Sequence, residues 1–313
     1  MSSYTDAFSI RGIFRLICGF PLMAYFYSIL QDWAIAVVST GPIPKHIAFV
    51  MDGNRRYAKL QNVALEAGHS AGAETLLNIL DICYRLGVEH VTIYAFSIEN
   101  FNRSKQEVDT LFGLLRDKLQ YLTKSDHLFA KFNQVKIRII GNKSYIPRDI
   151  LRDLDEVEAK TCNVTGNRVL NVCFPYTSRD DMTHAITTVV QKKVNQEIDH
   201  IDVETIKNNM YMGEDSPDLD IFIRTSGQYR LSDFMLWQVG ANCTIEFVNS
   251  LWPDFNFFDL MIIILKWSYT KTIEVENNLA LGLKPNADNL LVIKSILDEL
   301  PQPPPFHSVN QRD

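Results

Sequence analysis

The feature that most constrains the fold is an alternation of short apolar runs with longer segments of helical periodicity. The apolar runs are rich in Val, Ile and aromatic residues and lie at 46–51, 90–96, 135–140, 169–174, 219–223 and 244–248. Helical periodicity lies between and after them, near 70–86, 105–124, 147–161, 179–195 and 257–269. Continuous apolar strands alternating with helices indicate a parallel sheet that is buried on both faces. We therefore predict an α/β fold with a mostly parallel central sheet of about six strands covered by helices.

The 313-residue chain is long enough for one large domain or two small ones. No internal repeat or interior linker interrupts the alternating pattern, and we place the main domain at 42–270. An apolar segment, 1–41, precedes it. The polar tail, 271–313, has one helical stretch near 288–299 and then a proline run at 301–305 that will not continue a helix.

The N-terminal segment contains an uncharged apolar run at 16–30. Its length of fifteen residues falls short of the roughly 20 that a helix needs to span a bilayer. Arg11 and Arg15 precede the run and no small-residue cleavage site follows it, which argues against a cleaved signal peptide. Aromatic residues are dense here: Phe14, Phe20, Tyr25, Phe26, Tyr27 and Trp33. We predict an anchor at a membrane surface, with a helix packed on the protein's own core as the alternative.

Charge and cysteine usage exclude several classes of protein. The net charge of −6 argues against nucleic acid as a partner, because binding to a phosphate backbone needs a surplus of Lys and Arg. The five cysteines are odd in number and form no C-x-x-C pair, so neither a disulfide framework nor a zinc site is indicated. Reduced cysteines fit a cytosolic environment.

Polar residues follow the first apolar run directly, in the order Asp52, Gly53, Asn54, Arg55 and Arg56. Ligands of an open parallel sheet bind beyond the carboxyl ends of its strands. A glycine allows a sharp turn close to a ligand, and the arginines supply forked donors for phosphate oxygens. A carboxylate beside them suits Mg²⁺, which proteins often hold with one or two carboxylates plus substrate phosphates. The alternative is an ordinary β-turn with Asp and Gly at its corner.

Two further strand ends carry similar side chains. The run at 90–96 is followed by Ser97, Glu99, Asn100 and Arg103, and the run at 219–223 by Arg224, Arg230 and Ser232; His69 precedes the intervening helix. Solvation alone does not explain arginines at the same end of three strands, so we predict a crevice for a ligand with several phosphates, such as two diphosphates. The absence of a G-x-S-x-G elbow and of a G-x-x-x-x-G-K-S/T loop disfavours acyl transfer and nucleotide hydrolysis.

Several blocks of the sequence resemble the signature blocks of the cis-prenyltransferases, in order and at that family's spacing. They are HIAFVMDGNRRY at 46–57, Gly68 with His69, YAFSIENFNR at 94–103, RTSGQYRLS at 224–232 with Trp237 and Gln238, and LWPDF at 251–255. The resemblance covers about 42–269 and is nearer to the eukaryotic dehydrodolichyl diphosphate synthases than to the bacterial undecaprenyl diphosphate synthases. It implies a parallel sheet surrounded by helices, with an apolar tunnel under two diphosphate sites.

The resemblance also implies a reaction: isopentenyl diphosphate is condensed onto an allylic diphosphate, typically farnesyl diphosphate. The product is a long polyprenyl diphosphate, the dolichol precursor for protein glycosylation. Carried over residue by residue, Asp52 looks like the catalytic aspartate that binds Mg²⁺, and Asn100 like a group that assists proton removal. The implied substrate-binding residues are Gly53, Asn54, Arg55, Arg56, Tyr57, His69, Ser97, Glu99, Phe101 and Arg103, with Arg224, Arg230 and Ser232 around isopentenyl diphosphate. Leu111, Phe112, Leu115 and Leu119 are candidates for tunnel lining or for ordinary core.

The sequence departs from the family pattern in three places. Leu65 stands four residues before His69, where many members have a basic residue. Bacterial members have a second metal-binding glutamate at the place of Thr244, or of Cys243 if a short gap is placed differently. Glu246, on the same strand face as Thr244, could substitute. Homodimeric members end with an Arg-x-Gly motif, which is absent here and looks like the eukaryotic catalytic subunits. We expect a heteromer in which a Nogo-B receptor-type subunit supplies that tail, and otherwise a homodimer.

Four glycosylation sequons bear on where the protein lies in the cell. N-x-S/T sequons begin at Asn102, Asn142, Asn163 and Asn242. A glycan on Asn102 would block the predicted site, so we expect the site to face the cytosol, at the endoplasmic reticulum membrane or on lipid droplets.

Two alternative functions are open. A non-catalytic stabilising subunit of such a synthase is one alternative, but it would be expected to lose the aspartate and arginine motifs that this chain retains. A membrane-bound protein that binds lipid phosphates without turnover is the other.

Overall fold

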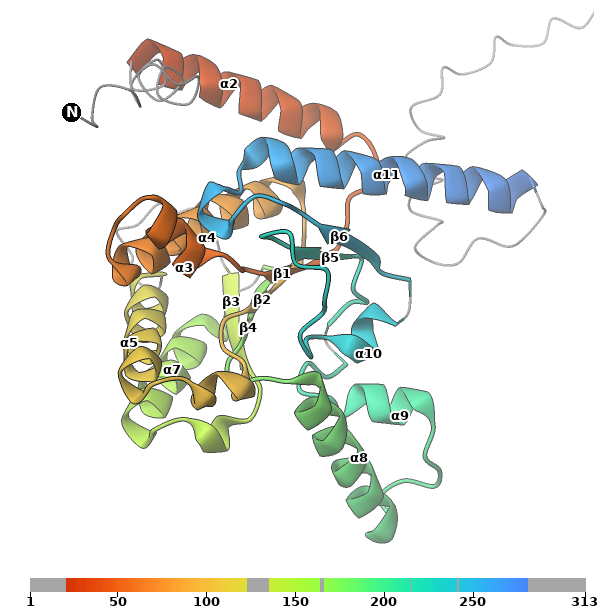
Figure 1. Ribbon diagram of the computed structural model, residues 1–313. Coiled ribbons are helices and arrows are strands. Elements are labelled where there is room, and N and C mark those ends of the chain that lie inside the picture. Colours follow the sequence, from red (N-terminus) through yellow and green to blue (C-terminus); the bar gives the residue numbers. More distant parts are fainter. Residues whose placement is uncertain (1–20, 123–134, 164–165, 215, 241, 281–313) are drawn as a thin grey trace, which may run out of the picture.

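The structure, a computed structural model, describes residues 21–122, 135–163, 166–214, 216–240 and 242–280 (Figure 1). Its centre is a six-stranded sheet in the order β3-β4-β2-β1-β5-β6, and every neighbouring pair of strands is parallel. The strands are β1 (His46–Val50), β2 (His90–Tyr94), β3 (Val135–Ile140), β4 (Arg168–Cys173), β5 (Ile221–Arg224) and β6 (Thr244–Phe247). The predicted parallel α/β fold is confirmed.

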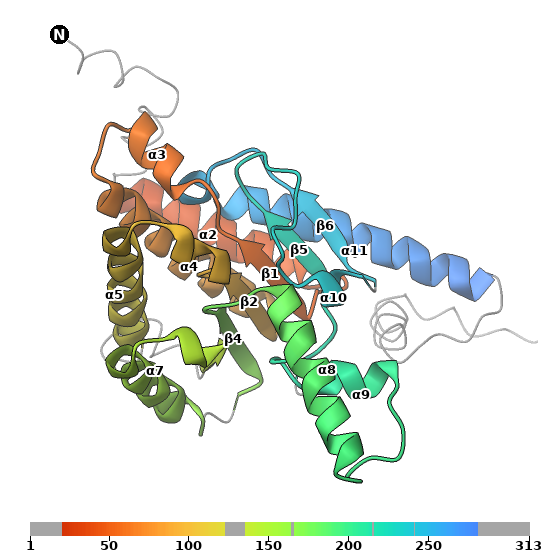
Figure 2. The ribbon, with the colours of Figure 1, turned by 60° about the horizontal axis from the view of Figure 1, so that its bottom comes forward.

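Helices cover both faces of the sheet (Figures 1 and 2). The α-helices are α2 (Pro21–Val38), α3 (Asn54–Leu60), α4 (Leu65–Leu86), α5 (Lys105–Leu122), α7 (Arg148–Thr161), α8 (Ser178–Val194), α9 (Val203–Asn208), α10 (Leu236–Val239) and α11 (Phe257–Ala280). Short 3-10 helices are η1 (Ile98–Asn102), η2 (Lys143–Tyr145) and η3 (Trp252–Asp254). The larger core cluster joins one face of the sheet to α2, α4, α5, α7 and α11.

Two predicted helix boundaries are corrected. The helix expected at 70–86 begins at Leu65, so His69 lies inside α4 rather than before it. The helix expected at 257–269 continues to Ala280, past the proposed domain boundary at 270, because Val275 still packs into the interior. The helical stretch predicted near 288–299 lies outside the described residues.

Helix α2 packs one side on the protein's own core, which was the alternative reading of the N-terminal segment, while membrane attachment stays a prediction. Pro21 is its first residue, and the helix continues through Gln31 and Asp32 without a break. Ile35 and Val38 are buried in the main core, and Asp32 forms an ion pair with Arg85 of α4. The opposite side of α2 is exposed. None of the helices in the described ranges is long and apolar enough to cross a membrane.

The strand register brings the three polar strand ends together. Parallel pairing aligns Phe49 of β1 with Ile93 of β2, and Val50 of β1 with Arg224 of β5. The segments that follow β1, β2 and β5 therefore leave the sheet at one edge, as expected for parallel strands. This edge carries the candidate site.

Candidate active site

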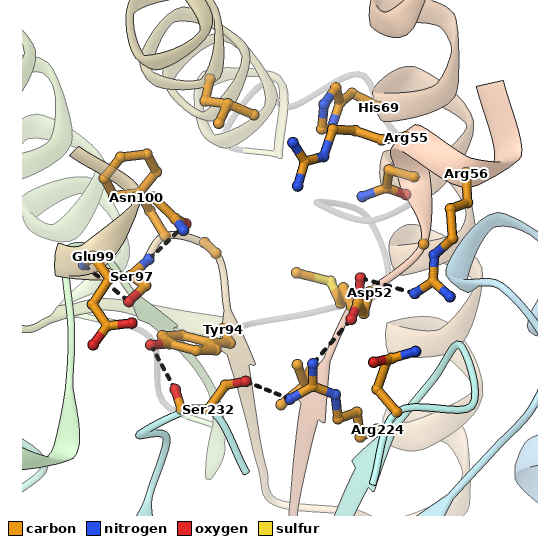
Figure 3. A pocket seen from close by; sticks show the side chains of 18 of the residues that line it. Asp52, Arg55, Arg56, His69, Tyr94, Ser97, Glu99, Asn100, Arg224 and Ser232 are labelled. Atoms are coloured by element: carbon orange, nitrogen blue, oxygen red, sulfur yellow. Dashed lines mark hydrogen bonds and ion pairs between the residues drawn. The ribbon is translucent and has the colours of Figure 1, made fainter. Parts of the chain in front are cut away.

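A cavity of about 760 Å³ opens at this edge of the sheet (Figure 3). It lies between the segments that follow β1, β2 and β5 and the helices α3, α4 and α5. The predicted site residues that line it are Asp52, Gly53, Asn54, Arg55, Arg56, His69, Ser97, Glu99, Asn100, Arg103, Arg224, Arg230 and Ser232. Side chains that are far apart in the sequence thus line one cavity, while their individual roles stay predictions.

Asp52 lies at the centre of the site, with its side chain 32% exposed. Its carboxylate accepts a hydrogen bond from Arg224 at 3.0 Å and lies 3.5 Å from the Arg56 guanidinium. The backbone is fixed as well, because Asp52 N donates to the Thr225 hydroxyl at 3.1 Å and that hydroxyl donates back to Asp52 O at 2.9 Å. Asp52 is therefore a single carboxylate held between two cations at the junction of β1 and β5.

Arg224 is the most buried cation of the site, with 3% of its side chain exposed. Besides Asp52, it donates to the Ser232 hydroxyl at 2.7 Å and to the Arg230 carbonyl at 2.6 Å. Burial lowers the pKa of Arg224, whereas the Asp52 carboxylate raises it. Arg224 thereby ties the end of β5 to the loop that presents Arg230 and Ser232.

Helix α3 presents the residues that follow β1. Gly53 adopts φ +111°, and a Cβ there would lie 3.0 Å from atoms of Leu251 and Ser226, so only glycine fits without strain. The following helix leans on Gly72 of α4, where a Cβ would meet the Asn54 amide oxygen at 2.3 Å. This close approach holds the first turn of α3 against α4 and directs Arg55 toward the cavity (Figure 3).

The wall after β2 is a capped 3-10 turn. The Ser97 hydroxyl accepts from Glu99 N at 3.2 Å, and the Asn100 amide oxygen accepts from Ser97 N at 3.1 Å. The orientation of Asn100 is thus set by the turn itself, with its side chain lining the cavity. At the end of the turn, Arg103 binds Glu107 of α5 at 2.9 Å.

His69 of α4 lies among these charges. Burial lowers its pKa, and nearby Arg103 lowers it further, so the imidazole is neutral at pH 7. Its Nε2 is buried and has no hydrogen-bond partner within the described ranges. Because His69 lines the cavity, this nitrogen is available to a bound ligand.

The lining is strongly cationic. Six Arg and Lys side chains line it against two carboxylates, those of Asp52 and Glu99. Glu99 is itself bound to Arg179 of α8 at 2.7 Å. In the part of the chain that the structure describes, Lys59 and Arg230 have no carboxylate partner. A cavity of this composition suits a ligand with several negative charges.

Sequence reasoning missed several lining residues. Lys59 lies one turn after Arg55 on α3, a spacing that could have indicated a shared face. Tyr94 ends β2 and donates from its hydroxyl to Ser232 O at 3.3 Å, which joins two walls (Figure 3). Outside the lining, Arg179 of α8 binds Asp233 at 2.7 Å and so joins that helix to the loop after β5. No local pattern announces these contacts, because their partners are distant in the sequence.

Two predicted site residues do not line the cavity. Tyr57 sits about 100° or more around α3 from Arg55, Arg56 and Lys59, which occupy the cavity side of that helix. Phe101 points into an aromatic cluster, with its ring 5.0 Å from that of Phe96.

The structure also places Glu246 and the tunnel candidates, while their roles stay predictions. Glu246 of β6 does not line the cavity either, because its carboxylate binds Lys266 of α11 at 2.6 Å. Of the tunnel candidates, Leu111 lines the cavity, whereas Phe112 and Leu119 are buried in the main core and Leu115 packs against it.

The donor set fits Mg²⁺ only in combination with a substrate. Among the described residues, no three His, Cys, Asp or Glu side chains gather into a group that could hold a metal ion. The cavity offers the Asp52 carboxylate beside cations that would bind phosphate oxygens. Mg²⁺ commonly binds to one or two carboxylates plus substrate phosphates, so Asp52 with a bound diphosphate is a suitable set.

Comparison with known proteins places the chain in a family. A family model described as putative undecaprenyl diphosphate synthase matches residues 50–273. The dehydrodolichyl diphosphate synthase complex subunit SRT1 of Saccharomyces cerevisiae is 44% identical over 86% of this chain and 80% of its own. The human dehydrodolichyl diphosphate synthase complex subunit DHDDS is 40% identical over 79% of this chain and 73% of its own.

A solved structure shares the fold. The crystal structure of lavandulyl diphosphate synthase from Lavandula x intermedia, in complex with dimethylallyl diphosphate, matches with a TM-score of 0.65 and 28% identity. The match covers 72% of this chain and 95% of that one. Fold, motif order and relatives agree, and the chain belongs to the undecaprenyl diphosphate synthase family of cis-prenyltransferases.

Proposed function

We propose that this chain condenses isopentenyl diphosphate onto an allylic diphosphate, with farnesyl diphosphate as the starter, to make a long polyprenyl diphosphate of the dehydrodolichyl type. The observation that carries the proposal is the cavity in which Asp52 lies among cations from three strand ends. Two diphosphates would match this charge and this extent. The names of the yeast and human relatives support dehydrodolichyl diphosphate as the product.

The chain's own residues would divide the work between the two substrates. Arg55 and Arg56 on α3 would hold the allylic diphosphate, and Arg224, Arg230 and Ser232 the isopentenyl diphosphate. The bond between the allylic carbon and its diphosphate breaks, and the guanidinium groups stabilise the negative charge that builds on the departing diphosphate. The isopentenyl double bond attacks that carbon, and a proton leaves the adjacent carbon to give the new cis double bond. Asn100, oriented by Ser97, would lie beside this proton.

Asp52 and the diphosphate oxygens would hold Mg²⁺. When bound, the ion adds positive charge to the leaving diphosphate. The pairing of Asp52 with Arg224 and Arg56 holds its carboxylate in place at the cavity before a substrate arrives.

A second subunit would complete the enzyme. The yeast and human relatives are named as subunits of a complex, which supports a heteromeric assembly. We propose that this second subunit is of the Nogo-B receptor type and contributes an Arg-x-Gly tail to the site. A homodimer is the alternative assembly.

The enzyme would work at the endoplasmic reticulum membrane or on lipid droplets, with its site toward the cytosol. The N-terminal apolar segment supports membrane attachment. The sequon at Asn102 supports the orientation, because Asn102 is exposed in η1 between the lining residues Asn100 and Arg103.

The test is incorporation of labelled isopentenyl diphosphate onto farnesyl diphosphate in detergent with Mg²⁺. The full chain is assayed alone and with an Arg-x-Gly-bearing partner. Asp52→Ala should abolish product, and Asp117→Ala, which removes an exposed carboxylate outside the cavity, should leave it unchanged. Activity of the lone chain would refute the partner requirement. A folded, partner-bound chain that makes no product under any condition would overturn the catalytic proposal in favour of a stabilising subunit.

A further inference from the structure

Helix α11 carries an apolar stripe on its outer side. The stripe consists of four exposed residues that recur every three or four positions and so lie on one face of the helix: Phe258, Ile262, Leu265 and Tyr269. Ile262 is 65% exposed and Tyr269 is 69% exposed. A helix on the surface of a soluble domain normally presents polar residues on this side.

The inner side of α11 is apolar as well. Leu260, Ile264 and Trp267 are buried in the main core, and they alternate around the helix with the exposed stripe. The outer stripe is therefore not needed to attach α11 to the sheet. A helix that is apolar on two opposite sides is expected to have a second apolar surrounding.

Helix α2 has the same arrangement and lies along α11 (Figures 1 and 2). Two contacts show this: the Tyr27 and Phe258 rings are 6.2 Å apart, and a Cβ on Gly41, just after α2, would lie 2.9 Å from the Ser268 hydroxyl, near the middle of α11. The outer stripe of α2 consists of Tyr25, Phe26, Ile29, Trp33 and Val37, all exposed. The two helices thus run side by side in the same direction, with their inner sides on one core.

Charged groups border the two stripes. Asp32 of α2 is 61% exposed and forms an ion pair with Arg85 of α4. Lys266 of α11 is 65% exposed and binds Glu246 of β6, and Glu276 follows the stripe in the last turns of the same helix side. Between these borders the exposed side chains are aliphatic or aromatic.

We propose that the outer stripes of α2 and α11 together form one docking face that lies in the interface of a lipid bilayer. Aliphatic residues mixed with Tyr and Trp are typical of a surface whose apolar part enters the acyl region while the ring polar groups meet the headgroups. The sequence continues this character toward the N-terminus, with an uncharged run from 16 and with Arg11 and Arg15 before it, which suit anionic headgroups.

This inference deepens the proposed function, because an enzyme that makes a polyprenyl lipid must deliver it to a bilayer. It goes beyond an N-terminal anchor by assigning half of the contact to α11. Two parallel helices also fix the orientation of the domain on the bilayer, which a single helix on a flexible connection would not do. The binding test below does not depend on catalysis.

The experiment is flotation of the full chain with vesicles of phosphatidylcholine that contain a fraction of phosphatidylserine. Ile262→Glu combined with Leu265→Glu should reduce the vesicle-bound fraction at least about tenfold, because it places two charges in the apolar contact. The matched control is Val190→Glu combined with Val194→Glu, which changes two exposed aliphatic residues of α8 and should bind as well as the wild type. Synthase activity in detergent should persist in both variants.

A second measurement identifies the occupant of the face directly. A photoreactive phenylalanine analogue in place of Ile262 should form an adduct with lipid in the presence of vesicles. An adduct with a second copy of the chain, or with residues 281–313, would overturn the proposal, and so would full vesicle binding by the α11 variant. Product formation without vesicle binding refutes the docking face alone, whereas vesicle binding without product formation refutes the proposed function alone.

Discussion

Replacing Arg224 by lysine tests whether the site depends on the forked geometry of one buried guanidinium or only on its charge. The guanidinium makes three hydrogen bonds, to Asp52, to the Ser232 hydroxyl and to the Arg230 carbonyl. A lysine would keep the positive charge. Its side chain is shorter and ends in a single nitrogen, so it would retain a hydrogen bond to one of the three acceptors.

The magnitude follows from the two bonds that are lost. A hydrogen bond from a charged donor contributes about 1.5–3 kcal/mol, and relaxation of the Arg230 loop toward water offsets part of the loss, so we expect destabilisation of about 3 kcal/mol. This corresponds to a fall of roughly 5–10 °C in Tm. The same free energy, if expressed in the transition state, lowers kcat/KM for isopentenyl diphosphate on the order of 100-fold.

Thermal unfolding and steady-state kinetics of the Arg224→Lys variant measure both effects. The control is Arg152→Lys on α7, since Arg152 is exposed and pairs with the neighbouring Asp153. The reasoning is refuted if Arg224→Lys melts within about 2 °C of the wild type and retains its kcat/KM within a few-fold. In that case charge alone would be sufficient at this position.

Three other predictions concern single residues. His46 is buried, and burial lowers its pKa to about 4, so protonation of this residue favours the unfolded chain. As the pH falls from about 6.5 to 4, we expect the unfolding free energy to fall by about 1.4 kcal/mol per pH unit. Urea unfolding measures this slope, which should flatten in His46→Gln. Lys59→Ala should raise the KM for the allylic diphosphate several-fold in kinetic assays, while Lys160→Ala on α7 should not. Glu246→Gln should leave the Mg²⁺ dependence of activity unchanged, since Glu246 binds Lys266. A shift of the Mg²⁺ titration in this variant would instead indicate that Glu246 is a metal ligand.

The sheet was predictable from the sequence because each strand is a continuous apolar run and each run is separated from the next by a helix-length segment. Val135–Ile140 matches the predicted bounds, and the other strands differ from theirs at the ends by one or two residues. The short helices α3, α9 and α10 were not predicted, because helices of seven residues or fewer show little periodicity. The extension of α11 beyond 270 was missed because its outer residues there are polar.

The site was predictable to the extent that parallel topology determines it. Strand-end position alone brought Asp52, Arg103 and Arg224 to one cavity. Contacts between loops were not predictable, since nothing in the local sequence pairs Tyr94 with Ser232. Glu246 shows what strand alternation does not predict. Alternation gives the side of the strand on which the carboxylate lies, but Lys266 on α11 determines what it binds.

The pairing of β1 with β5 has a consequence for how the protein is made. Asp52 and Arg224 are 172 residues apart in the chain, and β1 pairs with β5 over a similar separation. At about 5–20 residues per second on the ribosome, β1 waits roughly 9–35 s for its partner strand. During that time the edge of β1 that pairs with β5 in the folded protein is unpaired, and the long separation makes closure slow. The cavity around Asp52 therefore closes only after β5 has been made, and until then this edge is open to pairing with other chains.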